Sequence, residues 1–318
     1  MSFPPTKPSA SASRFLESKI LKNLEIFCMK KSLLLCIIAA AGFGIAPTVL
    51  QLAIQAGVSQ VTCVLFNNVL MMLVCLVMCL AGHHSLRIPG KKVIPLLLMG
   101  ACGMGFTVFL LTLSYQYIAV GTATVIQFLY PAIVTVACAI FMHRHLGKSA
   151  YLAIVLSIAV LLFISVIGTG ETSFQPTGML LALAAAFTYS FYIFGNEYYE
   201  IGELPVWSAV FYMATSAAVV FAIINIVSGQ FTLPPTGAAA GFMVGAAAIS
   251  CLSFLLLNIG IAGVGAAQAS FATLIEPIAA VICGVIVLNE KVTLFTIIGI
   301  VLILLSVWVN SMPSKEKA

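Results

Sequence analysis

The stretch SFATLIEPIAAVICGVIVLNEK (residues 270–291) decides the fold, because it places an ionisable residue and a proline inside an apolar run. Glu276 and Pro277 lie about halfway along it. A second stretch, TVIQFLYPAIVTVACAIFMHRH (residues 124–145), has the same form, with Pro131 in the matching place and Tyr130 where the glutamate stands. A helix that crosses a bilayer needs roughly 20 apolar residues. The two stretches therefore predict a membrane protein with an internal repeat.

The composition of the whole chain leads to the same conclusion. Of its 318 residues 62% are hydrophobic and only 7% are charged, whereas a soluble domain carries roughly 25% charged residues. The chain cannot cover a water-exposed surface, so lipid must be its main solvent. Its net charge of +5 comes from basic residues that flank the apolar runs, which gives no reason to expect a nucleic-acid partner.

The apolar runs predict an all-α membrane protein with ten transmembrane helices. Short polar breaks separate the runs, and each run is long enough to cross the bilayer. We expect the helices near residues 32–54, 60–81, 93–114, 120–142, 149–168, 176–196, 206–228, 237–258, 265–288 and 293–311.

The positions of the basic residues predict the orientation of the chain. Lys and Arg gather in the cytoplasmic loops of membrane proteins. With the N-terminus inside, 13 of the 14 basic residues lie on the cytoplasmic face, and Lys291 is left outside. We therefore expect a multi-pass protein of the inner or plasma membrane with both termini in the cytoplasm.

Residues 1–31 form the expected cytoplasmic N-terminal segment, for which two interpretations stay open. Leu16, Ile20, Leu24 and Phe27 share one helical face, which is typical of a helix lying on a membrane surface. Alternatively, Met29 followed by KKSLLLC is typical of a translation start. In that case the preceding residues are a dispensable extension.

An offset of 146 residues superposes Pro131 on Pro277 and aligns the ends of two halves without a gap. We expect the halves at residues 32–168 and 174–311, followed by a cytoplasmic tail at 312–318. Five is an odd number, so two five-helix repeats must insert with opposite orientation. Inverted repeats are the architecture of many secondary transporters, with the substrate site near the midplane between the halves.

Three motifs in this order resemble those of the drug/metabolite transporter superfamily, in its EamA-like family. They are AAAGFG (39–44), GMLLALAAAFTYSFYIF (178–194) and GAAQASFATLIEPIAAVICGVIVLNEKVT (265–293). The resemblance covers nearly the whole chain after residue 31 and implies a metabolite transporter. The chain departs from the family pattern in two places: Asn67 and Asn68 stand where an Arg is often found, and Arg144 replaces a common acidic residue.

Glu276 is the one ionisable residue that we place well inside a span. A charge at the centre of a membrane helix costs roughly 2.5–3.5 kcal/mol, so Glu276 should face protein or water. Two roles stay open for it: coupling to a proton or a substrate ammonium group, or a hydrogen-bonded lock between helices. Proline lacks a backbone N–H, so Pro131 and Pro277 predict kinks.

Other polar groups inside the spans are candidates for a substrate pathway. Their alternative role is an interhelical hydrogen bond, which contributes about 0.6 kcal/mol on average. The candidates are Asn67, Asn68, Gln127, Tyr130, Tyr189, Ser190, Gln268 and Ser270.

These features predict a secondary active transporter that moves a small polar metabolite by alternating access. The resemblance adds an amino acid or related compound as substrate, and efflux as the direction. Alternatives are an uncoupled facilitator or channel, and a membrane-embedded transferase. The last needs clustered Asp, His or metal ligands, but the chain has no Asp and its four His lie in short turns. We therefore expect no enzyme, no catalytic residues, no cofactor and no metal. The expected partners are the substrate, the bilayer and protons, for a monomer or homodimer.

Overall fold

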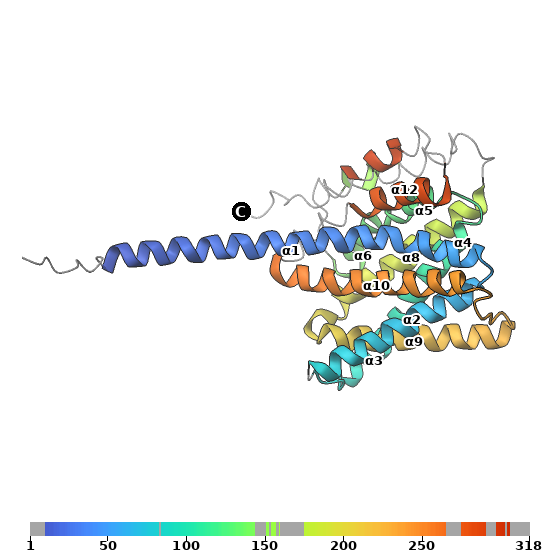
Figure 1. The fold of residues 1–318 in the computed structure, drawn as a ribbon, viewed down its shortest axis with the longest axis horizontal. Coiled ribbons are helices and arrows are strands. Elements are labelled where there is room, and N and C mark those ends of the chain that lie inside the picture. Colours follow the sequence, from blue (N-terminus) through green and yellow to red (C-terminus); the bar gives the residue numbers. More distant parts are fainter. Residues whose placement is uncertain are drawn as a thin grey trace, which may run out of the picture.

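The computed structural model describes residues 10–82, 84–143, 151–152, 154–156, 159, 175–264, 275–290, 297–302 and 304–305, and these contain helices and loops but no strand. Figure 1 shows long helices packed side by side, with α1 projecting from the bundle. The elements are α1 (Ala10–Gln55), α2 (Gln60–Ala81), α3 (Gly90–Leu98), η1 (Met99–Gly105), α4 (Phe106–Ser114), α5 (Val120–Gln127), α6 (Tyr130–Phe141), α8 (Pro176–Tyr198), η2 (Ile201–Glu203), α9 (Val206–Ser228), α10 (Gly237–Val264) and α12 (Ile275–Leu288).

Seven helical stretches in the described part are long and apolar enough to cross a membrane. The third combines α3, the π-helical η1 and α4, and the fourth combines α5 and α6. The expected ninth span is represented by α12. The spans expected at residues 149–168 and 293–311 fall mostly outside the described residues. The described helices thus confirm the all-α membrane fold.

Large apolar side chains cover the outer surface of the bundle. Ile226 and Val227 of α9 are 80% and 82% exposed, and Ile286 of α12 is 73% exposed. Water would disfavour so many exposed apolar groups. A lipid bilayer accepts them at no cost.

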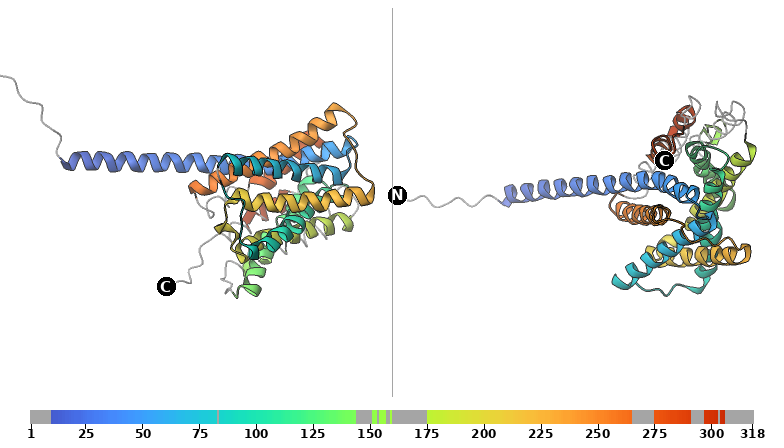
Figure 2. Two further views of the ribbon diagram at one scale, coloured as in Figure 1. Left: turned by 90° about the horizontal axis from the view of Figure 1, so that it is seen from below. Right: turned by 45° about the vertical axis from the view of Figure 1, so that its right-hand side comes forward.

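α1 continues far beyond its membrane-spanning part. It runs without interruption from Ala10 to Gln55, and Figure 2 shows its first turns extending away from the bundle along the axis of the first span. The structure therefore continues this segment into the first span as one helix, and its position relative to the membrane surface stays a prediction. The reason is local: residues 14–41 contain neither glycine nor proline, so nothing ends the helix before the span begins.

The offset of 146 residues relates the helices of the two halves. Shifted by this offset, α2 (60–81) falls on 206–227, which is α9 apart from its last residue. The third span, at 90–114, falls inside α10 apart from its first residue. The fourth falls on 266–287, where the described part is α12. The internal repeat is therefore present in the helices as well as in the sequence.

The two halves run in opposite directions. α1 ends at Gln55, and Gly57 in the following turn packs against the ring of Pro235, which precedes α10. Gln60, at the start of α2, donates from Nε2 to the carbonyl of Phe109, over 2.6 Å, and to the Thr112 hydroxyl, over 2.9 Å, both near the end of the third span.

α8 begins at the same end of the bundle. A methyl group at Gly178, in its first turn, would lie 2.7 Å from Cβ of Tyr117, in the turn that follows the third span. Since α1 finishes where its repeat equivalent α8 starts, the repeat is inverted.

Contacts between the halves follow the same symmetry. α1 packs on α10 and α12, and correspondingly α8 packs on α4 and on α5 and α6. One pair of equivalent helices meets directly, α2 with α9, and α12, the equivalent of α6, meets α5, the other part of the fourth span. The symmetry extends to side chains: Thr62 donates to Asn225 Oδ1 over 3.0 Å, and the equivalent pair, Ser208 and Cys79, lies 3.7 Å apart.

The two ends of the bundle differ in charge. The Lys and Arg residues whose side chains the structure describes lie at the start of the first span or between the second span and the first turn of the third, at the end that we call the Lys92 end: Lys30, Lys31, Arg87, Lys91 and Lys92. Glu290 lies at the opposite end, which we call the Glu290 end. Its described turns, at residues 56–59, 115–119, 229–236 and 289–290, contain no Lys or Arg.

Candidate functional site

Glu276 lies on the protein-facing side of α12. The exposed stripe of this helix consists of Ile278, Ile282 and Ile286, at 38%, 53% and 73% exposure. Residues four apart share a helix face, and Ala280, four residues after Glu276, is only 1% exposed. The Glu276 side chain is therefore directed into the bundle and away from the surface that meets lipid.

Gly44 of α1 packs directly against the backbone of Glu276. A methyl group at Gly44 would collide with the main-chain carbonyl oxygen of Glu276 and would lie 2.9 Å from Cβ of Ala279. Only glycine leaves room for this approach of α1 to α12. The contact joins the two halves, because α1 belongs to the first half and α12 to the second.

Tyrosine rings from α6 and α8 meet beside this contact. The ring centroids of Tyr130 and Tyr189 lie 4.7 Å apart with an angle of 77° between the planes. Tyr192 stacks on Tyr189 at 6.0 Å and 15°. Tyr189 also lies within electrostatic range of Glu276. We call Tyr130, Tyr189, Tyr192 and Glu276 the tyrosine–glutamate cluster.

The cluster is neither on the lipid-facing surface nor fully enclosed. All four of its residues keep a partly exposed side chain. On α8, the exposed residues Leu180 and Phe187, at 65% and 55%, form one face. Tyr189 follows Phe187 by two residues, which is about 200° around a helix and therefore the opposite face. The remaining exposure of Tyr189 thus lies toward the interior, where the two halves meet.

The fourth span is interrupted next to the cluster. α5 ends at Gln127, and α6 begins at Tyr130 with Pro131 in its first turn. Pro131 has no N–H to donate, so the carbonyl oxygen of Gln127 lacks its helical partner. In α12 Pro277 also lies in the first helical turn. An interrupted helix at membrane depth is tolerated where protein surrounds it or where it lines a polar cavity.

The other predicted residues have separate surroundings. Asn68 is fully buried and donates from Nδ2 to the Val64 carbonyl of its own helix, over 2.8 Å. Its Oδ1 is buried with no hydrogen-bond partner in the described part. Asn67 and Gln127 are each 8% exposed. Gln268 and Ser270 lie outside the described residues. The residues that the structure does bring together are Tyr130, Tyr189, Ser190 and Glu276.

Two members of this site were missed in the sequence. Tyr192 follows Tyr189 by three residues, so helical spacing alone would have placed both on one face. Gly44 precedes Ser190 by 146 residues, so the repeat marks it as the equivalent of a residue that we did select. The usable signals were therefore the helical period and the repeat offset.

The family model that matches this chain is that of the EamA-like transporter family. It matches twice, over residues 30–166 and 176–312. The curated relative "Uncharacterized transporter YdfC" of Bacillus subtilis (strain 168) is 25% identical over 230 residues, which cover 68% of this chain and 70% of YdfC.

One solved crystal structure resembles the chain over 86% of its length and over 96% of the other protein. The TM-score is 0.59 and the sequence identity is 15%. At this identity the likeness concerns the fold alone.

Proposed function

Because the chain belongs to the EamA-like transporter family, we propose that it is a secondary active transporter, which carries a small polar metabolite across the membrane by alternating access. The proposal rests mainly on the position of Glu276, a carboxyl group inside the bundle where the two inverted halves meet. Midplane sites between inverted repeats are where secondary transporters bind substrate and coupling ions.

The tyrosine–glutamate cluster supports a substrate that carries an ammonium group, such as an amino acid or a related compound. Aromatic faces attract cations, with about 2 kcal/mol or more at desolvated sites, and the Glu276 carboxylate would pair with the same charge. Tyrosine hydroxyls add hydrogen bonds to the polar part of the substrate. We place Ser190 beside this site, and Asn67, Asn68, Gln127, Gln268 and Ser270 along the pathway.

The Lys92 end is proposed to face the cytoplasm, since basic residues gather there. Export would then carry the substrate toward the Glu290 end across the inner or plasma membrane. A proton bound at Glu276 would supply the coupling, because a carboxyl group inside the bundle can alternate between a charged and a neutral form.

A second function is supported by the same cluster. Glu276 beside Gly44 would equally serve as a lock that holds α12 against α1, in a facilitator that moves solute only down its gradient. The two functions differ in one property: a coupled transporter accumulates substrate against its gradient, and a facilitator does not.

Transport by the full chain in proteoliposomes tests the proposal. A panel of labelled amino acids and amines is assayed by counterflow and then with an imposed pH gradient. Glu276→Gln is compared with Glu197→Gln, the same change at an exposed position of the Lys92 end. We expect saturable counterflow in both, with a higher half-saturation concentration in Glu276→Gln because the paired carboxylate is lost, and pH-driven accumulation that is lost only in Glu276→Gln.

Three other results would separate the coupled transporter from its alternatives. Accumulation that persists in Glu276→Gln excludes a coupling role for Glu276 and favours its structural role in holding α12 against α1. Counterflow without any accumulation in the unmodified protein supports the facilitator. Absence of saturable transport for the whole panel, with folded protein in the vesicles, contradicts transport of this substrate class.

A further inference from the structure

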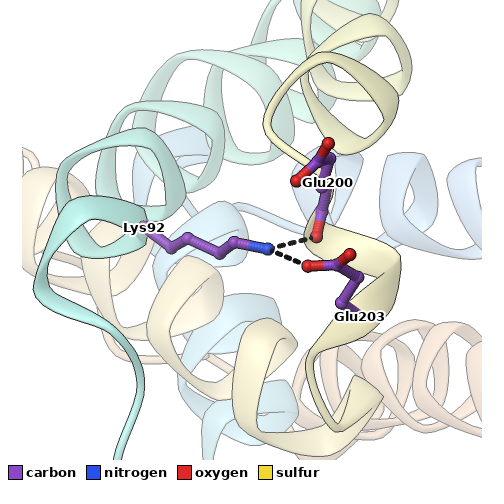
Figure 3. Close-up of polar contacts among 3 residues, drawn as sticks. All are labelled: Lys92, Glu200 and Glu203. Atoms are coloured by element: carbon purple, nitrogen blue, oxygen red, sulfur yellow. Dashed lines mark hydrogen bonds and ion pairs between the residues drawn. The ribbon is translucent and has the colours of Figure 1, made fainter.

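Lys92 joins the two halves at one end of the bundle. Its Nζ lies 2.8 Å from Oε2 of Glu203 and donates to the main-chain carbonyl oxygen of Glu200, over 2.6 Å (Figure 3). Lys92 belongs to α3 in the first half, whereas Glu200 and Glu203 lie in the turn between α8 and α9 in the second. The Lys92 side chain is only 17% exposed and that of Glu203 is 69% exposed.

The backbone near this contact has an uncommon conformation at Glu200 and further hydrogen bonds between the same segments. Glu200 adopts a left-handed conformation, with φ of 52°, which is uncommon for a residue with a side chain. Two neighbouring hydrogen bonds join the same segments: Ser208 donates to the Ser85 carbonyl over 2.9 Å, and Tyr212 donates to the Leu86 carbonyl over 3.1 Å. The loop before α3 is thus held to α9 as well.

Glu290 joins the halves at the opposite end. Its Oε1 accepts a hydrogen bond of 2.7 Å from the backbone N–H of Val120, the first residue of α5. The first amides of a helix have no partner within the helix, so a carboxylate there satisfies an otherwise free donor. Gly284 makes room for the carboxyl group, since a methyl group at that position would lie 2.5 Å from Oε2 of Glu290.

Neither contact has an equivalent at the other end, although the fold is an inverted repeat. The offset of 146 residues relates Lys92 to Ala238 and Glu203 to Gly57, so no ion pair can form at the equivalent place. It relates Glu290 to Arg144. A guanidinium group carries only donors and cannot accept a hydrogen bond from a backbone amide.

We propose that two chemically different clasps close the two ends of the pathway: an ion pair of Lys92 with Glu203 at one end, and a carboxylate helix cap of Glu290 on α5 at the other. Each end opens only when its own clasp separates. Their role in transport rests on the proposed function, but their effect on the two ends requires no substrate and can be measured without it.

The chain provides a reporter for each end. Trp207 follows the turn that holds Glu203 and packs against the same buried cluster as Ile88, and the second tryptophan, Trp308, is removed by Trp308→Phe. Acrylamide quenching of Trp207 then reports opening of that end. Hydrogen exchange of a peptide covering residues 116–124 reports the Val120 amide at the Glu290 end.

Four variants of the full chain in detergent test the clasps. We expect Lys92→Met to raise the quenching constant of Trp207 about twofold, the scale of an exposed ion pair, with unchanged exchange at 116–124. We expect Glu290→Ala to accelerate exchange at Val120 about tenfold, the scale of a hydrogen bond to a charged group, with unchanged quenching. Lys92→Arg and Glu290→Gln keep the donor and the acceptor and should remain near the unmodified protein.

The result that would overturn the proposal is equally clear. It fails if a variant leaves its own end unchanged, or if either variant alters both ends alike. Should Lys92→Met not fold, Glu203→Gln breaks the same ion pair from the other side. If the unmodified protein shows no transport while each variant still changes only its own end, the proposed function is contradicted and the two clasps are supported.

Discussion

The hydroxyl oxygen of Ser190 lies 3.3 Å from the main-chain carbonyl oxygen of Tyr130, while it donates its shorter hydrogen bond, of 2.6 Å, to the Ala186 carbonyl of its own helix. Its repeat equivalent is the contact of Gly44 with the carbonyl oxygen of Glu276. In both cases the first helix of one half approaches the residue that precedes a proline in the other half. Two equivalent contacts therefore join the halves. The contact of Ser190 with Tyr130 is polar, and the contact of Gly44 with Glu276 is close packing.

Substitution of Gly44 by alanine should destabilise the protein. The added methyl group would collide with the Glu276 carbonyl oxygen, and overpacking of this kind costs about 1–3 kcal/mol. The measurement is thermal unfolding in detergent. Gly241→Ala in α10 is the matched control, because a methyl group there would meet nothing within 4 Å. A Gly44→Ala protein as stable as Gly241→Ala would disprove the close packing.

Substitution of Thr62 by valine should weaken the pairing of α2 with α9. The Thr62 hydroxyl donates to Asn225 Oδ1 and accepts from the backbone N–H of Thr232 over 3.2 Å. Interhelical hydrogen bonds in membranes contribute about 0.6 kcal/mol on average, so we expect a loss of about 1 kcal/mol. Thr215→Val is the control, since that hydroxyl donates to the Phe211 carbonyl of its own helix over 2.6 Å. Equal losses in both variants would argue against a bond between the halves.

Removal of the Tyr189 ring should weaken substrate binding if the cluster holds the ammonium group. We expect Tyr189→Leu to raise the half-saturation concentration of counterflow about tenfold, the equivalent of about 1.4 kcal/mol, and Tyr189→Phe to raise it less. Phe187→Leu, at an exposed position of the same helix, is the control. An unchanged half-saturation concentration in Tyr189→Leu would place the substrate elsewhere.

Glu290 should make stability depend on pH. Burial raises the pKa of its carboxyl group above the usual range, although the amides of Val120 and Gly121 lower it. The folded protein then binds the proton more tightly than the unfolded chain, whose glutamates titrate near 4.3. The contribution to stability is full below that pH and is lost as pH rises through the raised pKa.

The comparison of unmodified protein with Glu290→Gln isolates this effect, since Tyr115 and Cys283, the described titratable groups that interact with Glu290, are present in both. The unfolding temperature of Glu290→Gln relative to the unmodified protein should rise as the pH increases from about 4.5. A difference that stays constant, or falls, would contradict a raised pKa.

Much of the fold follows from the sequence because lipid imposes simple rules. The predicted spans at 60–81 and 206–228 coincide with α2 and α9, since polar turns bound apolar runs of the required length. The wide turns of η1 were not foreseen. They depend on packing between helices: Gly100 lies against the backbone of Met213 in α9, and Gly103 against Tyr192 in α8.

The site was predictable only in part. The repeat offset brought Tyr130 and Glu276 to equivalent positions, and the structure places both where the halves meet. The Lys92–Glu203 pair is separated by 111 residues, so no helical period or motif spacing could have indicated it. Contacts of this kind depend on the tertiary packing of helices that are distant in the sequence. Local sequence patterns carry no information about that packing.

α1 is one continuous helix that contains Pro47 near its C-terminal end. At 1.5 Å per residue its 46 residues extend about 69 Å, more than twice the roughly 30 Å of a hydrocarbon core. The turns that project past the Lys92 end and the turn that carries Gly44 thus belong to one hydrogen-bonded shaft. A tilt of these first turns would therefore move the backbone beside Glu276 with them.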